Sequence, residues 1–431
     1  MKVTTKNTKE ILVYDDRVDR GIAGSAPRFV GTLYASQVRG KEVFSFSYDS
    51  KWLHSPFAQE FDPDLSLYEG PQYLQEGKCN FGMFLDSSPD RWGRVLMDRR
   101  ESIQARMEKR APRFLQESDY LLGVFDGQRM GALRFRESSD GPFLNDDITF
   151  ATPPATSLRR LEAATRELEE DAFQDDKETL KWLQLLLAPG SSLGGARPKA
   201  GVKETDNSLW IAKFPSRNDR YDVGAWEAVT HELARRAGLR VTQATAKRFS
   251  GRHHTFLTQR FDRTVSGGRL HFASAMTLLG YTDGTDSHEG ASYLELVEFL
   301  IRKGVRVNHE LEELFRRIVF SICVHNSDDH LRNHGFLLTP SGWVLSPAYD
   351  INPNPYATGL KLNISEHDNS LDLDLARQVS PWFRVKKDRT EEIICQVKEA
   401  VATWREVAAR YGLSRDEEER IGVCFAPDGL T

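Results

Sequence analysis

The sequence has few cysteines, and the four that it has lie far apart. Cys79, Cys323, Cys395 and Cys424 include no CxxC pair. This spacing argues against a structural zinc site and against a disulfide framework, so we expect reduced thiols in a cytoplasmic protein. Long apolar runs are also missing. None approaches the ~18 residues of a membrane-spanning helix, and the N-terminal segment lacks a secretory apolar stretch, so no membrane association is expected.

The sequence has no large excess of charge of one sign. Its 58 lysines and arginines face 63 aspartates and glutamates, which gives a formal net charge of −5. Nonspecific binding of nucleic acid needs clustered basic side chains, so this balance argues against it for the whole molecule but leaves a local patch open. Four Arg-Arg pairs lie in helix-like stretches, and we interpret them as solvated helix faces. The pairs are Arg99-Arg100, Arg159-Arg160, Arg235-Arg236 and Arg316-Arg317.

Length and composition predict more than one compact part. A single core stops growing near roughly 250–300 residues, and this chain has 431. Breaks in composition and in local pattern predict segments 1–150, 151–265 and 266–431. No internal repeat or low-complexity tract occurs, and 39% hydrophobic with 28% charged residues is typical of a globular protein.

Local patterns predict a β-rich first part and a helical last part. Short β-branched and aromatic runs bounded by Gly and Asp are typical of strands, and apolar residues at helical spacing are typical of helices. Strands are expected at 11–14, 28–33, 43–48 and 209–214, and helices from 91 onward and at 157–170, 225–237, 292–303, 309–323 and 391–411.

The segment just after the expected helix 309–323 carries the strongest chemical signal. His325-x-x-Asp328-x-x-x-x-Asn333 has the Asp-to-Asn interval of the kinase catalytic loop, in which Asp accepts the substrate proton and Asn is a ligand of Mg²⁺. The pair alone is common by chance. Downstream, 343–350 is expected to be a short strand that ends in Asp350, a second oxygen ligand for Mg²⁺. Taken without its neighbours, Asp350 fits a turn residue equally well.

Two further residues upstream fit a nucleotide site. Lys213 is the only lysine in the apolar strand-like run 209–214, and a buried lysine is costly unless it meets an anion such as a phosphate. Glu227, fourteen residues later, is a candidate partner for Lys213. Considered alone, Glu227 is better explained as a first-turn glutamate favoured by the helix dipole.

A glycine-containing loop precedes the lysine strand. Residues 191–200 contain Gly194 and Gly195, which allow backbone amides to approach phosphates. The spacing matches neither a Walker A loop nor GxGxxG, so a flexible turn is the alternative. The order of loop, strand lysine, helix glutamate, Asp-x-x-x-x-Asn and later aspartate is nevertheless that of a phosphotransferase.

Several motifs resemble those of the HipA-type toxin kinases. Ser192–Lys199 resembles their S-x-x-G-A-x-x-K loop, and Gln259–Arg263 resembles their E-R-F-D-R hinge. Asn326–Asn333 and Tyr349–Ile351 resemble their catalytic and metal motifs. The N-terminal third is similar as well, most clearly at Ser88–Arg94. The resemblance covers most of the chain.

The resemblance implies an α+β, bilobal, divergent protein-kinase-like fold. A β-rich N-terminal lobe would carry an added N-terminal subdomain, and the C-terminal lobe would be helical. It further implies a serine/threonine kinase that uses ATP and Mg²⁺, phosphorylates a protein substrate such as an aminoacyl-tRNA synthetase, and halts growth as the toxin of a toxin-antitoxin pair. The implied partner is a small HipB-like helix-turn-helix antitoxin, through which the complex would reach operator DNA.

The resemblance also assigns roles to residues of this chain. Asp328 matches the catalytic base, Asn333 and Asp350 match the metal ligands, and Ser192 matches the autophosphorylated serine, whose modification ejects the loop. The implied ATP contacts are Gly194, Gly195, Ala196, Arg197, Pro198, Lys199, Lys213, Gln259, Arg260, Phe261, His330, Leu331, Arg332, Asn333, Tyr349 and Asp350.

The sequence departs from the family pattern at three places. Gln259 replaces the usual Glu of the hinge, where recognition through the backbone tolerates the change. His271–Ser274 replaces a polar segment, so contacts assigned there are not carried over. Arg197-Pro198 is expected to stiffen the loop.

Two other functions compete with the kinase. One is a metal-dependent phosphohydrolase or nuclease, because His and Asp crowd the catalytic segment and suit transition metals. The crowded residues are His325, Asp328, Asp329, His330 and His334. The other is an inactive kinase-fold regulator that binds an antitoxin and DNA. The identity of the protein substrate, the existence of an antitoxin and the oligomeric state are not predicted by the sequence.

Overall fold

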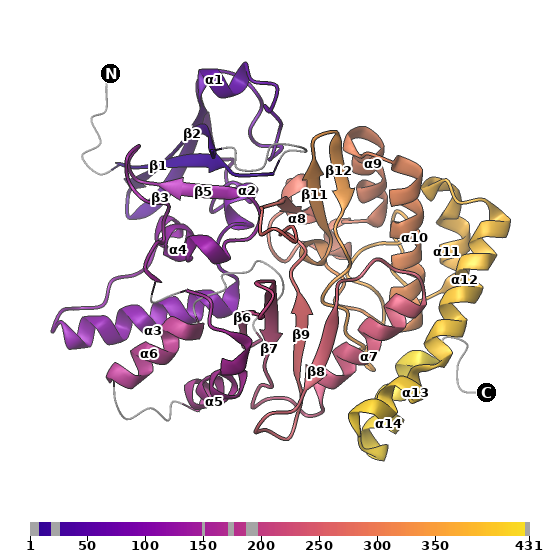
Figure 1. Ribbon diagram of the computed structural model, residues 1–431. Helices are drawn as coiled ribbons and strands as arrows, with labels where there is room; N and C mark the ends of the chain where they lie inside the picture. The colour runs from indigo at the N-terminus through magenta and orange to yellow at the C-terminus, as the bar shows by residue number, and fades with distance from the viewer. Residues whose placement is uncertain (1–7, 19–25, 149–150, 171–175, 187–196, 427–431) are drawn as a thin grey trace. The chain divides into compact units, whose positions relative to one another are not determined.

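The chain forms two compact units in a computed structural model that describes residues 8–18, 26–148, 151–170, 176–186 and 197–426. The first unit comprises Met1–Leu209 and Asp262–Thr282, and the second comprises Trp210–Phe261 and Asp283–Thr431. The α+β class is confirmed, with antiparallel sheets toward the N-terminus and mainly helices in the last part (Figure 1). The three-segment division at 150 and 265 stays a prediction.

A five-stranded antiparallel sheet dominates the first unit, in the order β4-β3-β2-β1-β5. The strands are β1 Thr8–Asp15, β2 Arg28–Val38, β3 Lys41–Tyr48, β4 Pro71–Tyr73 and β5 Leu133–Arg136. Side chains alternate between the two faces of a strand, and in β3 this places Phe44, Phe46 and Tyr48 in the core while their neighbours are more accessible. The three strands predicted for this region are confirmed.

The other elements of the first unit include the helix predicted from residue 91. Helix α3 begins at Arg91 because the carboxylate of Asp90 accepts a hydrogen bond from the amide of Gly93 at 2.9 Å and caps the first turn. The elements are α1 Ser50–Leu53, α2 Gly82–Leu85, α3 Arg91–Met107, α4 Glu117–Gly123, η1 Asp126–Gln128, η3 Ala155–Ser157, α5 Leu158–Glu169, α6 Asp176–Leu186, β6 Lys199–Lys203, β10 His271–Ser274 and α8 Ala275–Leu278.

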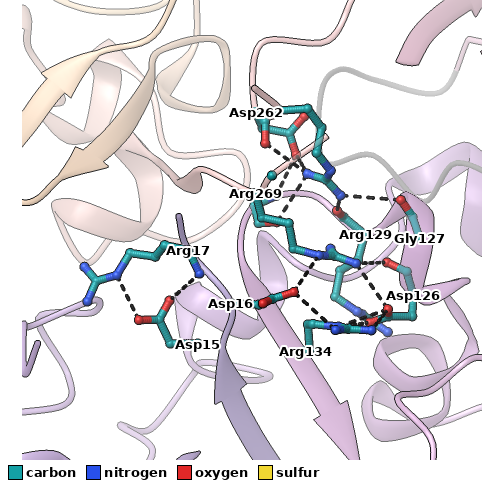
Figure 2. A network of polar contacts seen from close by, with 12 residues as sticks. Asp15, Asp16, Arg17, Asp126, Gly127, Arg129, Arg134, Asp262 and Arg269 are labelled. Carbon is teal, nitrogen blue, oxygen red and sulfur yellow. Dashed lines mark hydrogen bonds and ion pairs between the residues drawn. The ribbon is translucent and has the colours of Figure 1, made fainter. Parts of the chain in front are cut away.

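Buried ion pairs tie residues 262–269 to the rest of the first unit, as Figure 2 shows. The Arg269 guanidinium donates to the backbone oxygen of Asp126 at 2.7 Å and to its carboxylate at 3.1 Å, and Arg134 of β5 donates to the same carboxylate. The carboxylate of Asp262 accepts a hydrogen bond from the amide of Gly131 at 2.9 Å. Side chains far apart in the sequence thus hold this late segment in the first unit.

A small antiparallel sheet and helix α7 open the second unit. Strand β9 (Thr255–Gln259) pairs on one side with β7 (Leu209–Lys213) and on the other with β8 (Ala244–Lys247). Helix α7 (Val223–Arg236) packs closely beside β9. Gly224 allows this approach, because a Cβ there would lie 2.1 Å from the backbone oxygen of His254.

The remainder of the second unit is mainly helical, as predicted. Helix α10 is buried along most of its length and precedes the candidate catalytic segment. The elements are η4 Ser287–Glu289, α9 Tyr293–Lys303, α10 Val307–Cys323, η5 Leu331–Asn333, β11 Gly335–Thr339, β12 Gly342–Leu345, α11 Leu373–Val379, η6 Ser380–Phe383, α12 Lys387–Ala402, α13 Trp404–Ala408, η7 Ala409–Tyr411, α14 Arg415–Gly422 and η8 Val423–Phe425.

The single helix predicted for 391–411 is wrong in its bounds. The chain instead forms α12, α13 and η7, with a break at Thr403. The Thr403 hydroxyl donates to the backbone oxygen of Ala400 at 2.6 Å, and such local bonds compete with helix continuation. Within the described ranges, no helix combines the length and the apolar character that crossing a membrane would need.

Candidate functional site

A buried lysine bridges two carboxylates in the second unit. Lys213 is the last residue of β7, and its Nζ lies 2.5 Å from Glu227 Oε1 and 2.6 Å from Asp350 Oδ1. Burial alone would lower the pKa of Lys213, but the carboxylates of Asp350 and Glu227 outweigh burial and raise it. The lysine is therefore charged, and its charge is matched by anions at a buried site.

Glu227 has a larger role than its sequence context indicated. Helix α7 begins at Val223, two residues before the predicted start, so Glu227 lies beyond the first turn. Glu227 is only 2% exposed and is paired with Lys213. The interpretation as an ordinary first-turn glutamate is wrong, because the side chain points into the protein toward a cation on a strand.

The Asp-x-x-x-x-Asn spacing corresponds to a direct contact. Asp328 is exposed in the loop after α10, and Asn333 closes the short helix η5. Asn333 Nδ2 donates a hydrogen bond to the backbone oxygen of Asp328 at 2.8 Å. The Oδ1 atom of Asn333 is buried and accepts no hydrogen bond from the part of the chain that the structure describes.

The carboxylate of Asp328 is harder to ionise than an ordinary aspartate. Partial desolvation raises its pKa, and the nearby carboxylate of Asp350 raises it further, while His330 acts in the opposite direction. Asp328 thus combines an accessible carboxylate with a raised pKa, a combination that suits a group that accepts a proton during a reaction.

The neighbouring Asp329 anchors this loop from inside the protein. Its carboxylate accepts a hydrogen bond from the Tyr293 hydroxyl at 2.5 Å and from Ser321 Oγ at 3.3 Å, and it pairs with His334 Nε2 at 3.0 Å. Burial would raise the pKa of Asp329, but His334 and these hydrogen bonds outweigh it and lower the pKa. The sequence offered no signal for Tyr293, which lies on α9, 36 residues before Asp329.

Asp350 does not lie at the end of a strand, which corrects the prediction. Strand β12 ends at Leu345, and Ala348 instead donates its amide hydrogen to the backbone oxygen of Arg240 at 2.7 Å. Asp350 itself has a left-handed backbone with φ +57°. Its Oδ1 accepts a hydrogen bond from Asn352 Nδ2 at 3.1 Å in addition to the lysine contact.

The predicted hinge residues are mostly buried at the end of β9. Gln259 is the last residue of the strand, and Arg260 and Phe261 are 4% and 9% exposed. The Phe261 ring packs against Tyr349 with centroids 5.5 Å apart, and the Tyr349 hydroxyl donates to the backbone oxygen of Arg332 at 2.7 Å. These contacts join the hinge, the catalytic loop and the segment before Asp350 within one unit.

The predicted phosphate loop is only partly described. Ser192, Gly194, Gly195 and Ala196 lie outside the described residues, whereas Arg197 and Pro198 precede β6 in the first unit. Lys199 opens β6. Lys199 was expected to contact a phosphate, but in the structure its ammonium group contacts a carboxylate.

Lys199 forms a buried ion pair instead of extending toward solvent. Its Nζ lies 2.6 Å from Asp90 Oδ2, and the two side chains are 2% and 3% exposed. The indole Nε1 of Trp92 donates to the backbone oxygen of Lys199 at 3.2 Å. The motif around Asp90 and Trp92 therefore anchors the start of β6. The divergent segment 271–274 is likewise internal, since all four residues of β10 are buried.

The site residues fit a magnesium–nucleotide better than a transition metal. Magnesium prefers a few hard oxygen ligands together with phosphates, and Asn333 Oδ1 and the Asp350 carboxylate are such oxygens, the latter side chain being 20% exposed. Among the described residues, no three His, Cys, Asp or Glu side chains are grouped so as to hold a metal ion.

Comparisons with known proteins place this geometry in a family context. The model of the HipA-like C-terminal domain matches residues 191–404. The chain is 25% identical over 228 residues to the serine/threonine-protein kinase toxin HipA of Shewanella oneidensis, a match that covers 46% of this chain and 50% of that protein. It is also 23% identical over 282 residues to toxin YjjJ of Escherichia coli K12, a match that covers 63% of this chain and 59% of that protein. The chain thus spans about half the length of these curated relatives.

A solved structure supports the same fold. HipA in the complex of Shewanella oneidensis HipA, HipB and operator DNA superimposes with a TM-score of 0.63 at 17% identity, over 93% of each chain. At this identity the likeness concerns the fold. Residues 191–404 match the model of the HipA-like C-terminal domain, and the chain is distantly similar in sequence to a HipA serine/threonine-protein kinase toxin and in fold to HipA.

Proposed function

We propose that the chain is an ATP-dependent serine/threonine protein kinase that acts as the toxin of a toxin-antitoxin pair. The observation that carries this proposal is the bridge of Lys213 between Glu227 and Asp350, in the same unit as the Asn333–Asp328 contact. A lysine paired with a helix glutamate, an Asp-to-Asn loop and a later aspartate form the group that protein kinases use for phosphoryl transfer.

The proposed reaction needs three tasks from these side chains. Asp328 accepts the proton of the substrate hydroxyl while the hydroxyl oxygen attacks the γ-phosphorus of ATP. The bond between the γ-phosphorus and the β–γ bridging oxygen breaks, and ADP leaves. Lys213 binds phosphate oxygens and exchanges its contact with Asp350 for them. Asn333 Oδ1 and Asp350 would hold Mg²⁺, which would supply positive charge to the phosphates.

The remaining assigned residues have supporting roles in the proposal. The hinge Gln259–Phe261 receives the adenine mainly through backbone groups, and Tyr349 packs beside it. His330, Leu331 and Arg332 contact the nucleotide from the catalytic loop. The resemblance assigns phosphate contacts to residues 194–199, and within this range the ammonium group of Lys199 is paired with Asp90.

Partners and substrate are proposed from the relatives. The HipA structure of Shewanella oneidensis contains HipB and operator DNA, so we infer a small helix-turn-helix antitoxin for this chain and contact with DNA through that complex. A cytoplasmic translation component, such as an aminoacyl-tRNA synthetase, is the proposed substrate, and Ser192 the proposed site of autophosphorylation.

The test is a comparison of wild type with Asp328→Gln. In cells that express each protein, phosphoproteomics should detect serine or threonine phosphorylation that depends on Asp328, and growth should stop only with the wild type. Intact-mass analysis after incubation with ATP should find one phosphate on Ser192. Persistent toxicity of Asp328→Gln would refute the role of Asp328. Hydrolysis of phosphate esters without ATP would instead favour the hydrolase, and antitoxin binding without ATP turnover would favour the inactive regulator.

A further inference from the structure

The backbone of Asp350 lies in the left-handed region, with a φ of +57°. Aspartate adopts this region more readily than most other residues, but less readily than the extended and right-handed helical regions. Such a residue persists where surrounding contacts fix the chain on both sides. The question is which contacts hold this segment, because they also aim the Asp350 carboxylate.

One contact comes from α7. Thr230 is fully buried on this helix, and its hydroxyl donates to the backbone oxygen of Ile351 at 2.7 Å. A helical threonine usually satisfies its hydroxyl within its own helix. Here the internal acceptors, the backbone oxygens of Trp226 and Glu227, both lie farther away at 3.1 Å. The shortest of the three contacts is therefore the one that leaves the helix.

Thr230 and Glu227 are three residues apart, so they share one face of α7. Through this face the helix reaches Asp350 at two points. Glu227 binds Lys213, which binds the Asp350 carboxylate, and Thr230 binds the backbone of the following residue, Ile351. One helix thus restrains the side chain of Asp350, through Lys213, and the main chain of the next residue, Ile351.

The catalytic loop supports the other end of the segment. The amide of Asn352 donates to Asn326 Oδ1 at 3.1 Å, and Asn354 Nδ2 donates to Ser327 Oγ at 2.7 Å. The Asn352 amide belongs to the same peptide group as the Ile351 oxygen, so Thr230 and Asn326 hold this group through its two polar atoms. Loss of the Thr230 hydroxyl should therefore loosen the chain next to Asp350 without detaching the whole segment.

We propose that Thr230 is a positioning residue that keeps Asp350 oriented to bind Mg²⁺ with ATP. The inference rests on the proposed role of Asp350 as a metal ligand. It goes beyond that role by making metal binding depend on the seating of α7, through a hydrogen bond that is separate from the Lys213–Glu227 pair.

The experiment compares Thr230→Val, which keeps the shape but lacks the hydroxyl, with Thr230→Ser, which keeps the hydroxyl. Thr242→Val is the matched control, because the Thr242 hydroxyl bonds Thr258 in the same unit at 2.9 Å. With ATP held saturating, the Mg²⁺ concentration for half-maximal phosphoryl transfer should rise about three- to tenfold in Thr230→Val, the range expected from one buried hydrogen bond. It should stay within about twofold of wild type in Thr230→Ser and Thr242→Val.

Amide hydrogen exchange gives a readout that does not need activity. Peptides covering 350–354 should exchange faster in Thr230→Val than in wild type or Thr230→Ser, while α10 stays equally protected. Unchanged exchange and an unchanged Mg²⁺ requirement in Thr230→Val would refute the proposal, and so would equal effects of Val and Ser. If the wild type transfers no phosphate, the proposed function fails, and the exchange data alone then decide whether Thr230 positions this segment.

Discussion

Replacing Glu227 by Gln should weaken both the second unit and the proposed reaction. The substitution keeps the size of the side chain and removes its charge beside the buried Lys213. A hydrogen bond to a charged group contributes about 1.5–3 kcal/mol, and breaking a buried ion pair completely costs about 3–5 kcal/mol. Because Lys213 keeps Asp350 at 2.6 Å, we expect the lower range, a loss of about 1.5–3 kcal/mol.

The effect on phosphoryl transfer follows from the same contacts. Without the charge of Glu227, the ammonium group of Lys213 is held by Asp350 alone, and both groups are less available to phosphate and metal. If the lost free energy appears in the transition state, kcat/KM falls about 10- to 150-fold, since about 1.4 kcal/mol corresponds to a factor of ten.

Native-state hydrogen exchange of the α7 amides measures the stability of this part of the chain locally, which suits a protein with two compact units. Glu232→Gln is the matched control on the same helix. Glu232 pairs with Arg235, which is 62% exposed, and with Arg236, and such surface pairs contribute only about 0–1 kcal/mol. The reasoning is refuted if Glu227→Gln changes the hydrogen-exchange protection of α7 and the rate of phosphoryl transfer no more than Glu232→Gln does.

Three further substitutions test other parts of the molecule. Asp328→Asn should abolish phosphoryl transfer and leave the urea unfolding midpoint unchanged, since the side chain is exposed. In the wild type, the rate of phosphoryl transfer should fall as the pH is lowered through the raised pKa of Asp328, and this fall should occur at a higher pH than the pKa of an ordinary aspartate. Tyr293→Phe removes a hydrogen bond to the buried Asp329 and should lower the free energy of unfolding by about 1.5–3 kcal/mol; an unchanged urea midpoint would contradict this. Lys199→Met removes the ammonium group that neutralises Asp90 and should lower the free energy of unfolding by about 3–5 kcal/mol. A loss of nucleotide binding with unchanged stability would instead indicate that Lys199 contacts a phosphate.

Local sequence patterns predicted elements in both units. Helix α3 begins directly after Asp90, at the predicted residue 91, and the apolar run that ends at Lys213 forms strand β7. The Asp328-to-Asn333 spacing also corresponds to a contact, because the two residues lie five positions apart in one short loop. Signals of this kind are local, so they can be recognised without knowledge of the fold.

Other features had no local signal. Lys199 was expected at phosphate, but its partner Asp90 lies 109 residues earlier. Glu227 was interpreted as an ordinary helix-start glutamate, because a glutamate near the start of a helix is common. Only the packing of α7 brings its side chain to Lys213. The strand before Asp350 is shorter than predicted, because β12 ends at Leu345 opposite Phe336 of β11, and Ala348 then bonds to the distant backbone oxygen of Arg240.

The sequence by itself therefore determined which residue types stand at each step of the proposed site and in which order. The spacing of hydrophobic residues, the helix caps and the short-range motifs depend on residues that are close in the sequence, so they can be recognised without the structure. Only the tertiary structure decided which charges meet: that Lys213 joins Glu227 to Asp350, and that Thr230 reaches Ile351. These pairs form because buried charges and hydroxyl groups must find partners where the elements pack. Lys213 and Asp350, for example, lie 137 positions apart in the sequence.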